Sequence, residues 1–504
     1  MPDAEGLVAP LDTHNRELIA NVHPVEWVNP EPADRYHLLV LGGGTGGLVS
    51  AAGAALLGAR VALVEERLLG GDCLVSGCVP SKALIRAAEA WHEAATAAER
   101  FGGPRVTGPG DFGAVMERMR RLRAEISHHD SAARFRDLGV DVFLGRGRFV
   151  ASDAIEVGGE RLRFSRAVVA TGARPLVPPI EGLEEAGYLT NETLFELTEL
   201  PRRLGVVGGG PIGCEMGQSF ARFGSRVTLI DQEPRLLPRE EAEAAAIVQR
   251  ALERDGVAMA LGAAVRRVES MASGKRVHLE GRTEPIEVDE LLLAVGRSPN
   301  SRGLGLSAAG VEHGRGGIEV DDRLRTSNRR VFAVGDVASR YQFTHMADAL
   351  ARIALRNALF LGRARASDLV VPWCTYTRPE VAHVGLSEAE AREAGHAVRT
   401  LRVPLATVDR AVLAGEAEGF LSLVVGQRGG RVLGATLVAD QAGEMLGELC
   451  LAVTRRVGLD RIADVIHPYP TRVEVVRKAA DEWRRGKLTP LVSRLLRLWL
   501  RLTA

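Results

Sequence analysis

The chain contains the same strand, glycine turn, helix and strand pattern twice, and this duplication restricts the fold more than any other sequence feature. Residues 36–66 and 204–231 each begin with an apolar strand, continue through a turn with the spacing G-x-G-x-x-G, and end in a second strand. An acidic residue follows the first glycine of the turn by 23 positions in both copies. Two such βαβ units predict an α/β protein with parallel sheets.

Each position in this pattern has a physical purpose. The first glycine allows the turn, the second lets a pyrophosphate approach the backbone, and the third lets the helix pack on the strand. The helix start faces the phosphates, and the acid accepts hydrogen bonds from ribose hydroxyls. The candidate cofactor-binding residues are therefore Gly42, Gly44, Gly47 and Glu65 in the first copy and Gly208, Gly210, Gly213 and Asp231 in the second. Two dinucleotide sites indicate a bound flavin and a nicotinamide that reduces it.

Composition excludes several other classes of protein. The 504 residues suffice for about three domains, and a formal net charge of zero gives no electrostatic reason to expect nucleic acid as a partner. Five cysteines are too few for a secreted disulfide framework, and residues 1–20 lack the basic and apolar regions of a signal peptide. No run of 18 apolar residues is present. We therefore expect a cytoplasmic protein.

Two of the cysteines, Cys73 and Cys78, lie close together in the stretch GGDCLVSGCVPSK. Residues five apart in a straight α-helix have Cα atoms roughly 8–9 Å apart, whereas a disulfide needs less than about 7 Å. A bond between them therefore requires an interrupted helix, which Gly77 and Pro80 make plausible. A redox pair, a zinc site and two inert thiols all remain open, although the other cysteines are scattered and we expect no metal site.

Further motifs identify a family. Besides the two glycine turns and the cysteine stretch, the chain contains ATGA, AVGRSPN, AVGDVA and HPYPTRVE. From residue 36 to about 490 it resembles the flavin-dependent pyridine-nucleotide–disulfide oxidoreductases, which include lipoamide dehydrogenase, glutathione reductase and mercuric reductase. The resemblance implies two Rossmann-like dinucleotide-binding domains, for FAD and NAD(P), plus a C-terminal α+β dimerisation domain. It also implies a homodimer, because the partner's C-terminal domain completes each active site in this family.

The predicted boundaries follow from the positions of the motifs. An N-terminal extension covers 1–34, the FAD-binding domain covers 35–185 and 298–368, and the NAD(P)-binding domain covers 186–297. The dimerisation domain covers 369–488 and a basic amphipathic tail helix covers 489–504.

The resemblance also implies roles for individual residues. Cys78 would lie over the flavin as the charge-transfer thiolate, and Cys73 would be the interchange thiol that faces the substrate. Lys82 and Glu215 would pair near the reactive nitrogen of the flavin. Further cofactor-binding residues implied in this way are Thr171, Gly172, Gly296, Gly335 and Asp336. The expected path takes electrons from nicotinamide through FAD to Cys73–Cys78 and on to a small-molecule or metal-ion acceptor.

One motif departs from the family pattern. Disulfide reductases of this family carry H-x-H-P-T-x-x-E, in which the second histidine is an acid–base catalyst oriented by the glutamate. This chain has His467, Tyr469 and Glu474, with the tyrosine at the catalytic position. A phenol with a reference pKa of about 10 exchanges protons poorly near neutral pH, and His467 matches the family's first, non-catalytic histidine. An organic disulfide is therefore a poor candidate substrate.

A tyrosine at this position is typical of mercuric reductases, but their C-terminal cysteine pair is absent from LVSRLLRLWLRLTA. We therefore predict a mercuric-reductase-like enzyme that passes electrons to another acceptor. The alternatives are an NADH:quinone or metal diaphorase that hardly uses the thiols, a dihydrolipoyl dehydrogenase, and, outside enzymes, a flavin-binding redox sensor.

Two further expectations concern the nicotinamide and the C-terminus. Asp231, followed by Gln232 and Glu233, favours NADH over NADPH because carboxylates repel a 2′-phosphate; Arg235 is the nearest residue that opposes this preference. In residues 489–504, three arginines fall within about 60° of one helical face and the rest is mostly apolar. This helix either contacts a membrane surface, where a quinone would be a natural acceptor, or docks on the protein's own body or across the dimer.

Overall fold

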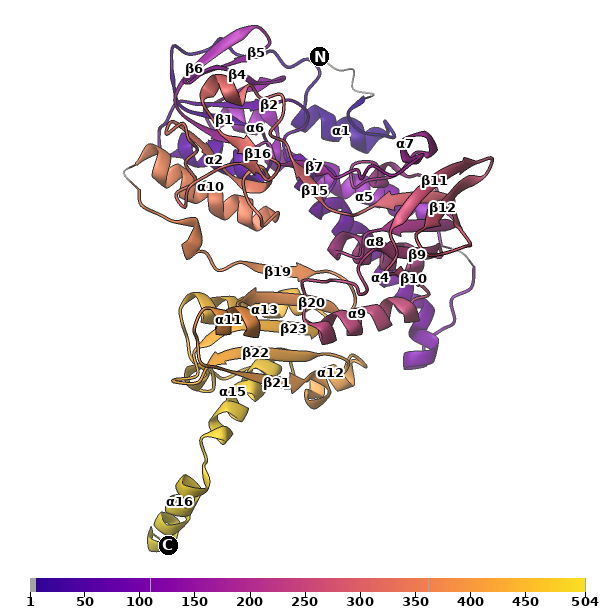
Figure 1. The fold of residues 1–504 in the computed structure, drawn as a ribbon, viewed down its shortest axis with the longest axis vertical. Coiled ribbons are helices and arrows are strands. Elements are labelled where there is room, and N and C mark those ends of the chain that lie inside the picture. The colour runs from indigo at the N-terminus through magenta and orange to yellow at the C-terminus, as the bar shows by residue number, and fades with distance from the viewer. Residues whose placement is uncertain (1–5, 109, 361, 504) are drawn as a thin grey trace. The chain divides into compact units, whose positions relative to one another are not determined.

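The computed structural model describes residues 6–108, 110–360 and 362–503. The chain forms two compact units, which are described separately. The first unit extends to Pro234 and resumes over Val257–Asp368, and the second unit comprises Arg235–Gly256 and the chain from Leu369 onward. Figure 1 labels their helices and strands. Within the described residues, no helix combines the length and apolarity that crossing a bilayer requires.

The first dinucleotide pattern forms the centre of a seven-stranded sheet. Strands β1 (Tyr36–Leu41), β2 (Val61–Glu65) and β3 (Val140–Leu144) are parallel, and β1 also pairs in parallel with β6 (Glu160–Val169). Strand β18 (Val331–Ala333) pairs with the other side of β6, so a segment far along the chain completes this sheet. Strands β4 (Arg148–Ala151) and β5 (Ala154–Val157) extend it antiparallel. The helices α2 (Thr45–Leu56) and α10 (Thr344–Leu359) pack on each other beside it (Figure 1).

The second dinucleotide pattern forms a parallel four-stranded sheet in the same unit. Its order is β10 (Ala258–Leu261), β9 (Arg226–Asp231), β8 (Arg203–Val207) and β14 (Glu290–Leu293), with α8 (Pro211–Phe223) after the glycine turn. An antiparallel sheet of β11 (Val265–Met271), β12 (Gly274–Leu279) and β13 (Ile286–Val288) accompanies it. Strands β7 (Ala173–Pro175) and β15 (Arg297–Pro299) pair separately. The remaining helices used below are α3 (Gly71–Val75), α4 (Cys78–Phe101) and α5 (Phe112–Ser127).

The second unit is built on a five-stranded antiparallel sheet. Its strand order is β19 (Pro372–Thr375), β20 (Glu380–Gly385), β23 (Val432–Ala439), β22 (Phe420–Gly426) and β21 (Val398–Pro404). Its core consists of these strands with α13 (Ala442–Thr454) and α15 (Glu474–Gly486). The other helices of this unit are α9 (Ala242–Arg254), α11 (Glu388–Glu393), α12 (Asp409–Leu413), α14 (Leu459–Ile462) and α16 (Pro490–Thr503). The predicted tail, residues 489–504, contains α16.

The described part of the N-terminal extension contains a helix that packs on the rest of the first unit. Its helix α1 (Thr13–Val22) buries Leu18 and Val22 and packs on α5. The Arg123 guanidinium donates to Asn15 Oδ1 at 2.7 Å, and Trp27 Nε1 donates to a strand carbonyl at 3.0 Å. Polar side chains of the extension therefore form specific contacts with the rest of the first unit.

Candidate active site

The first glycine turn is packed too closely for side chains. A Cβ on Gly42, whose φ is +107°, would lie 2.4 Å from the carbonyl oxygen of Ala170, and a Cβ on Gly47 would lie 1.8 Å from that of Gly42. Helix α2 begins directly afterwards and has no side-chain cap, so its first amides remain available for phosphate oxygens. Glu65 accepts from the amide of Gly43 at 2.5 Å, and burial raises its pKa.

The second glycine turn repeats this geometry. A Cβ on Gly208 would lie 2.4 Å from the carbonyl oxygen of Ala294, and one on Gly213 would lie 1.8 Å from that of Gly208. Nothing lies within 4 Å of the Cβ position of Gly210, so the approach to the uncapped start of α8 is open. Asp231 accepts from the amide of Gly209. Both turns therefore fit the pyrophosphate of a dinucleotide.

The two cysteines lie on either side of a helix break, as their spacing requires. Cys73 lies in α3, Ser76 and Gly77 interrupt the helix, and Cys78 is the first residue of α4. Both thiols are free; Cys73 is half-buried and Cys78 is exposed. The Sγ of Cys78 lies 3.3 Å from the hydroxyl of Thr344, at the first position of α10. A thiolate at Cys78 would thus benefit from the N-terminal end of the 24-residue helix α4.

The two thiols have opposite acidities. A hydrogen bond with Cys73, a second with Thr344 and the charge of Lys82 together lower the pKa of the Cys78 thiol to about 6, against the effect of burial. The hydrogen bond with Cys78, together with burial, raises the pKa of Cys73. At neutral pH, Cys78 is therefore the first thiol of the pair to lose its proton. The resulting thiolate is the more nucleophilic form of a thiol.

Lys82 and Glu215 form an ion pair between the helix that follows the cysteine stretch and the helix that follows the second glycine turn. Lys82 lies on α4, one turn after Cys78, and Glu215 lies on α8, just after the second glycine turn. The Lys82 ammonium is 2.8 Å from Glu215 Oε2, and the glutamate side chain is only 7% exposed. A buried carboxylate thus holds the lysine beside the thiol pair. The predicted pairing is present, while its role toward a flavin stays a prediction.

A second ion-pair network lies around Asp336 and involves residues that sequence reasoning missed. Asp336 lies in the short turn Gly335–Val337, and burial raises its pKa to about 6 against the charge of Arg297. The Arg297 Nε is 3.4 Å from Asp336, and its guanidinium also donates to Asp72, the residue before Cys73. Arg297 belongs to the AVGRSPN motif and Asp72 to the cysteine stretch, so both stood beside recognised signals. Thr344 carried no signal of this kind.

The remaining predicted cofactor residues form loops of the first unit. Thr171 donates to the carbonyl of Asn300 at 2.8 Å. The glycines Gly172, Gly296 and Gly335 have φ values of +67°, +127° and +71°, which side chains other than glycine rarely adopt.

The residues of the HPYPTRVE motif lie in the second unit, where Tyr469, His467 and Glu474 each have a different charged partner. Tyr469 is 69% exposed and donates to Asp409 Oδ2 at 2.8 Å, which raises the pKa of the phenol. His467 pairs with Glu448 at 3.0 Å. Glu474 faces Lys478 at 3.4 Å through Oε1, while its Oε2 is buried without a hydrogen-bond partner among the described residues. The hydroxyl of Tyr469 thus bonds to the carboxylate of Asp409 and not to that of Glu474.

Comparisons with known proteins agree with the motifs. Residues 36–351 match the family model for pyridine nucleotide-disulphide oxidoreductases, and residues 371–480 match the dimerisation domain of that family. A mercuric reductase of Lysinibacillus sphaericus is 37% identical over 96% of this chain and 90% of its own length. A dihydrolipoyl dehydrogenase of Thermus scotoductus is 37% identical over 88% of this chain and 97% of its own length.

Solved structures show the same likeness. The HOCl-induced flavoprotein disulfide reductase RclA of Escherichia coli superimposes with a TM-score of 0.80 at 29% identity, covering 88% of this chain and 99% of that one.

Proposed function

Because the chain belongs to the pyridine nucleotide-disulphide oxidoreductases, we propose that Cys73 and Cys78 are the redox-active pair of this enzyme. The family makes the chain an FAD-dependent oxidoreductase that uses NAD(P)H, and its dimerisation domain supports a homodimer. The observation that carries the proposal is the interrupted helix, which leaves Cys78 at the start of α4 and Cys73 in α3, just before the break. Bound FAD supplies the two-electron relay between the nicotinamide and the thiols.

The chain's own residues have separable tasks in this proposal. The first glycine turn, Glu65 and the loop residues Thr171, Gly172, Gly296, Gly335 and Asp336 hold FAD, and the second turn with Asp231 holds the nicotinamide nucleotide. Lys82, held by Glu215, keeps a positive charge beside Cys78 and favours its thiolate. Cys73, with the raised pKa, keeps its proton and faces the acceptor as the interchange thiol.

We also propose NADH as the physiological reductant. Asp231 and the exposed Glu233 repel the 2′-phosphate of NADPH. Arg235, the residue that could oppose this, already donates to the carbonyls of Leu237, Pro238 and Glu240 at 2.6–3.3 Å. Because its guanidinium is already hydrogen-bonded within its own loop, it is not placed to bind a 2′-phosphate, and this supports the preference for NADH.

The proposed acceptor is a small molecule or a soft metal ion rather than an organic disulfide. Tyr469 donates to Asp409, and the raised pKa of its phenol makes it a weak proton donor. Thiolates bind soft cations without such a donor. A mercuric-reductase-like reaction is therefore the first candidate, although residues 489–504 contain no cysteine. The dihydrolipoyl dehydrogenase relative keeps lipoamide as a second candidate.

The proposed location is the cytoplasm, with residues 489–504 in contact with a membrane surface. A quinone would then be within reach as an acceptor, which is the diaphorase alternative.

Anaerobic titration of the holoenzyme with NADH tests the thiol mechanism. We expect a long-wavelength thiolate–flavin absorbance at two electrons per FAD in the wild type. Cys73→Ser and Cys78→Ser should each keep FAD and lose thiol-dependent reduction of mercuric ion or another accepted substrate, whereas Cys450→Ser serves as the matched control. Full activity in either active-site variant would exclude the disulfide mechanism and favour the diaphorase. A wild type that NADH does not reduce would leave only the flavin-binding sensor.

The orphaned Oε2 of Glu474 allows a second test. Tyr469→His supplies an imidazole that this buried carboxylate oxygen can orient, and we expect a rise in lipoamide turnover of at least about tenfold. Tyr469→Phe removes the same hydroxyl without adding a base and is the control. An unchanged lipoamide rate in a folded Tyr469→His variant would mean that the missing base does not limit this reaction.

A further inference from the structure

Helix α16 is amphipathic, and all of its apolar side chains stay exposed. No residue of α16 is buried, and its apolar side chains are 37–75% exposed; they are Leu491, Val492, Leu495, Leu496, Leu498, Trp499, Leu500 and Leu502. The preceding helix α15 is also amphipathic, but it buries Val475, Val476, Ala479, Ala480 and Trp483 in the core of the second unit. The apolar face of α16 therefore lacks the partner that α15 has.

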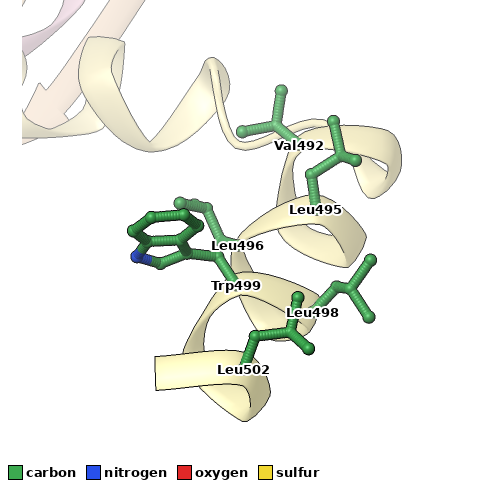
Figure 2. Close-up of a pocket in the computed structure, with 6 residues that line it drawn as sticks. All are labelled: Val492, Leu495, Leu496, Leu498, Trp499 and Leu502. Atoms are coloured by element: carbon green, nitrogen blue, oxygen red, sulfur yellow. The ribbon is translucent and has the colours of Figure 1, made fainter. Parts of the chain in front are cut away.

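The faces of α16 are sharply divided. At 100° per residue, the three arginines span about 60° of the helix and the apolar residues span about 200°. Figure 2 shows six of these apolar side chains projecting from the helix, with Trp499 between Leu496 and Leu502 along the chain. An arc this wide exposes far more apolar surface than a stray surface leucine does, and it marks an interaction site.

The charge on the other face selects the kind of partner. Residues 489–504 contain no acidic residue, and Arg494, Arg497 and Arg501 have no carboxylate ion pair among the described residues. In α15, by contrast, Arg477 pairs with Asp481 and Arg484 pairs with Asp464. Three uncompensated arginines beside a wide apolar arc are complementary to a surface that is anionic above and apolar below, which describes an anionic lipid bilayer.

We infer that α16 lies in the plane of an anionic bilayer, with Trp499 and the leucines among the upper acyl chains and the arginines at the lipid phosphates. This inference rests on the proposed membrane contact and deepens it by naming the lipid class and the orientation. A helix of 14 residues is about 21 Å long, so it cannot span a hydrocarbon core of about 30 Å.

A second copy of the helix is the main competing occupant. Leu491, Leu495, Leu498 and Leu502 follow the four-and-three spacing of a coiled-coil seam. That seam would use only part of the arc and would leave Val492, Leu496, Trp499 and Leu500 in water. A bilayer covers the whole arc, and this wider coverage favours lipid.

Vesicle sedimentation of the holoenzyme tests the inference. Vesicles of phosphatidylcholine alone are compared with vesicles containing 30% phosphatidylglycerol, at low and high salt. We expect at least about tenfold tighter binding to the anionic vesicles, weakened by salt. The triple variant R494Q/R497Q/R501Q should lose this preference, and Leu495→Glu with Leu498→Glu should lose binding altogether. Arg485→Gln, an exposed arginine of α15, is the matched control.

Two outcomes would overturn the inference. One is binding that is absent, or equal on both kinds of vesicle. The other is a tail-dependent, concentration-dependent self-association beyond the dimer in solution, which would assign the face to a second copy. NADH oxidation with the soluble acceptor ferricyanide should be unchanged in all tail variants. If the wild type itself did not oxidise NADH with ferricyanide, the proposed function would be contradicted. The vesicle result would still be judged independently.

Discussion

The two glycine turns share one backbone geometry but differ in what surrounds them. In both, a Cβ on the third glycine would lie 1.8 Å from the carbonyl oxygen of the first. The start of the cysteine stretch also contacts the first turn. The amide of Gly70 donates to the carbonyl of Gly43 at 2.8 Å, and Gly44 forms a β-bridge with Gly70. The second turn has open space at Gly210. The same turn geometry thus occurs once beside the thiol site and once with open space in front of it. This difference fits a resident FAD at the first turn and an exchanging nicotinamide nucleotide at the second.

Adding one methyl group to each turn should separate their roles with the largest effect. Gly47→Ala places Cβ against a backbone oxygen beneath the thiol site, so we expect a loss of stability above about 4 kcal/mol and protein without FAD. Gly213→Ala makes the same clash in the second glycine turn, so we expect a comparable loss of stability. The protein that folds should nevertheless retain FAD, while kcat/KM for NADH falls at least about a hundredfold. FAD content and NADH kinetics measure both.

Gly217→Ala on α8, whose Cβ would meet only side chains at 3.8 Å, is the control for these substitutions. If Gly47→Ala kept FAD as well as Gly213→Ala does, the first turn would not be the flavin site.

The ion pair between α4 and α8 tests whether the thiol site and the second glycine turn are coupled. Lys82→Met leaves the buried carboxylate of Glu215 without its cation, and we expect a loss of about 1–3 kcal/mol of stability. Thermal unfolding measures this loss, and stopped-flow absorbance should show slower reduction by NADH. The double variant Lys82→Met/Glu215→Leu should recover the stability but not the reduction rate. Recovery of both would reduce the pair to a structural contact.

Two cysteines near the starts of α4 and α8 should respond differently to pH. The pKa of Cys78 is lowered to about 6, so in NADH-reduced enzyme its alkylation by iodoacetamide should be fast at pH 7 and should fall about tenfold per pH unit below 6. Burial raises the pKa of Cys214, which should stay unreactive up to pH 9. Site-resolved mass spectrometry measures both rates. Lys82→Met should move the Cys78 profile to higher pH, and an unmoved profile would exclude the lysine as a cause.

The smallest expected difference concerns the acid of the second turn. We expect NADH to exceed NADPH by at least about tenfold in kcat/KM, which corresponds to about 1.4 kcal/mol. Asp231→Ser should narrow that ratio, and Arg235→Gln should leave it unchanged because Arg235 is bound to its own loop. Steady-state kinetics with both nucleotides measure the ratio. Equal use of NADPH by the wild type would contradict the assignment.

Local spacing in the sequence sufficed for much of the candidate site. The two glycine turns, the break between Cys73 and Cys78, and the tail helix α16 were all predictable. Each depends on backbone geometry within a few residues: the turn angle, the helical period, or the reach of a disulfide. The resemblance to the family added the pairing of Lys82 with Glu215, which are 133 positions apart.

Contacts between distant segments could not be predicted in this way. Thr344 reaches Cys78 from 266 positions away, and Arg297 connects Asp72 to Asp336. Tyr469 was recognised as a substitution, but its bond to Asp409 depends on how a loop and the short helix α12 pack. The sequence by itself determined the repeated unit, the thiol spacing and the amphipathic tail, because periodicity and local sterics act along the chain. Only the tertiary structure decided which charges and hydroxyls surround the thiols, because packing, and not sequence distance, brings those groups within hydrogen-bonding range.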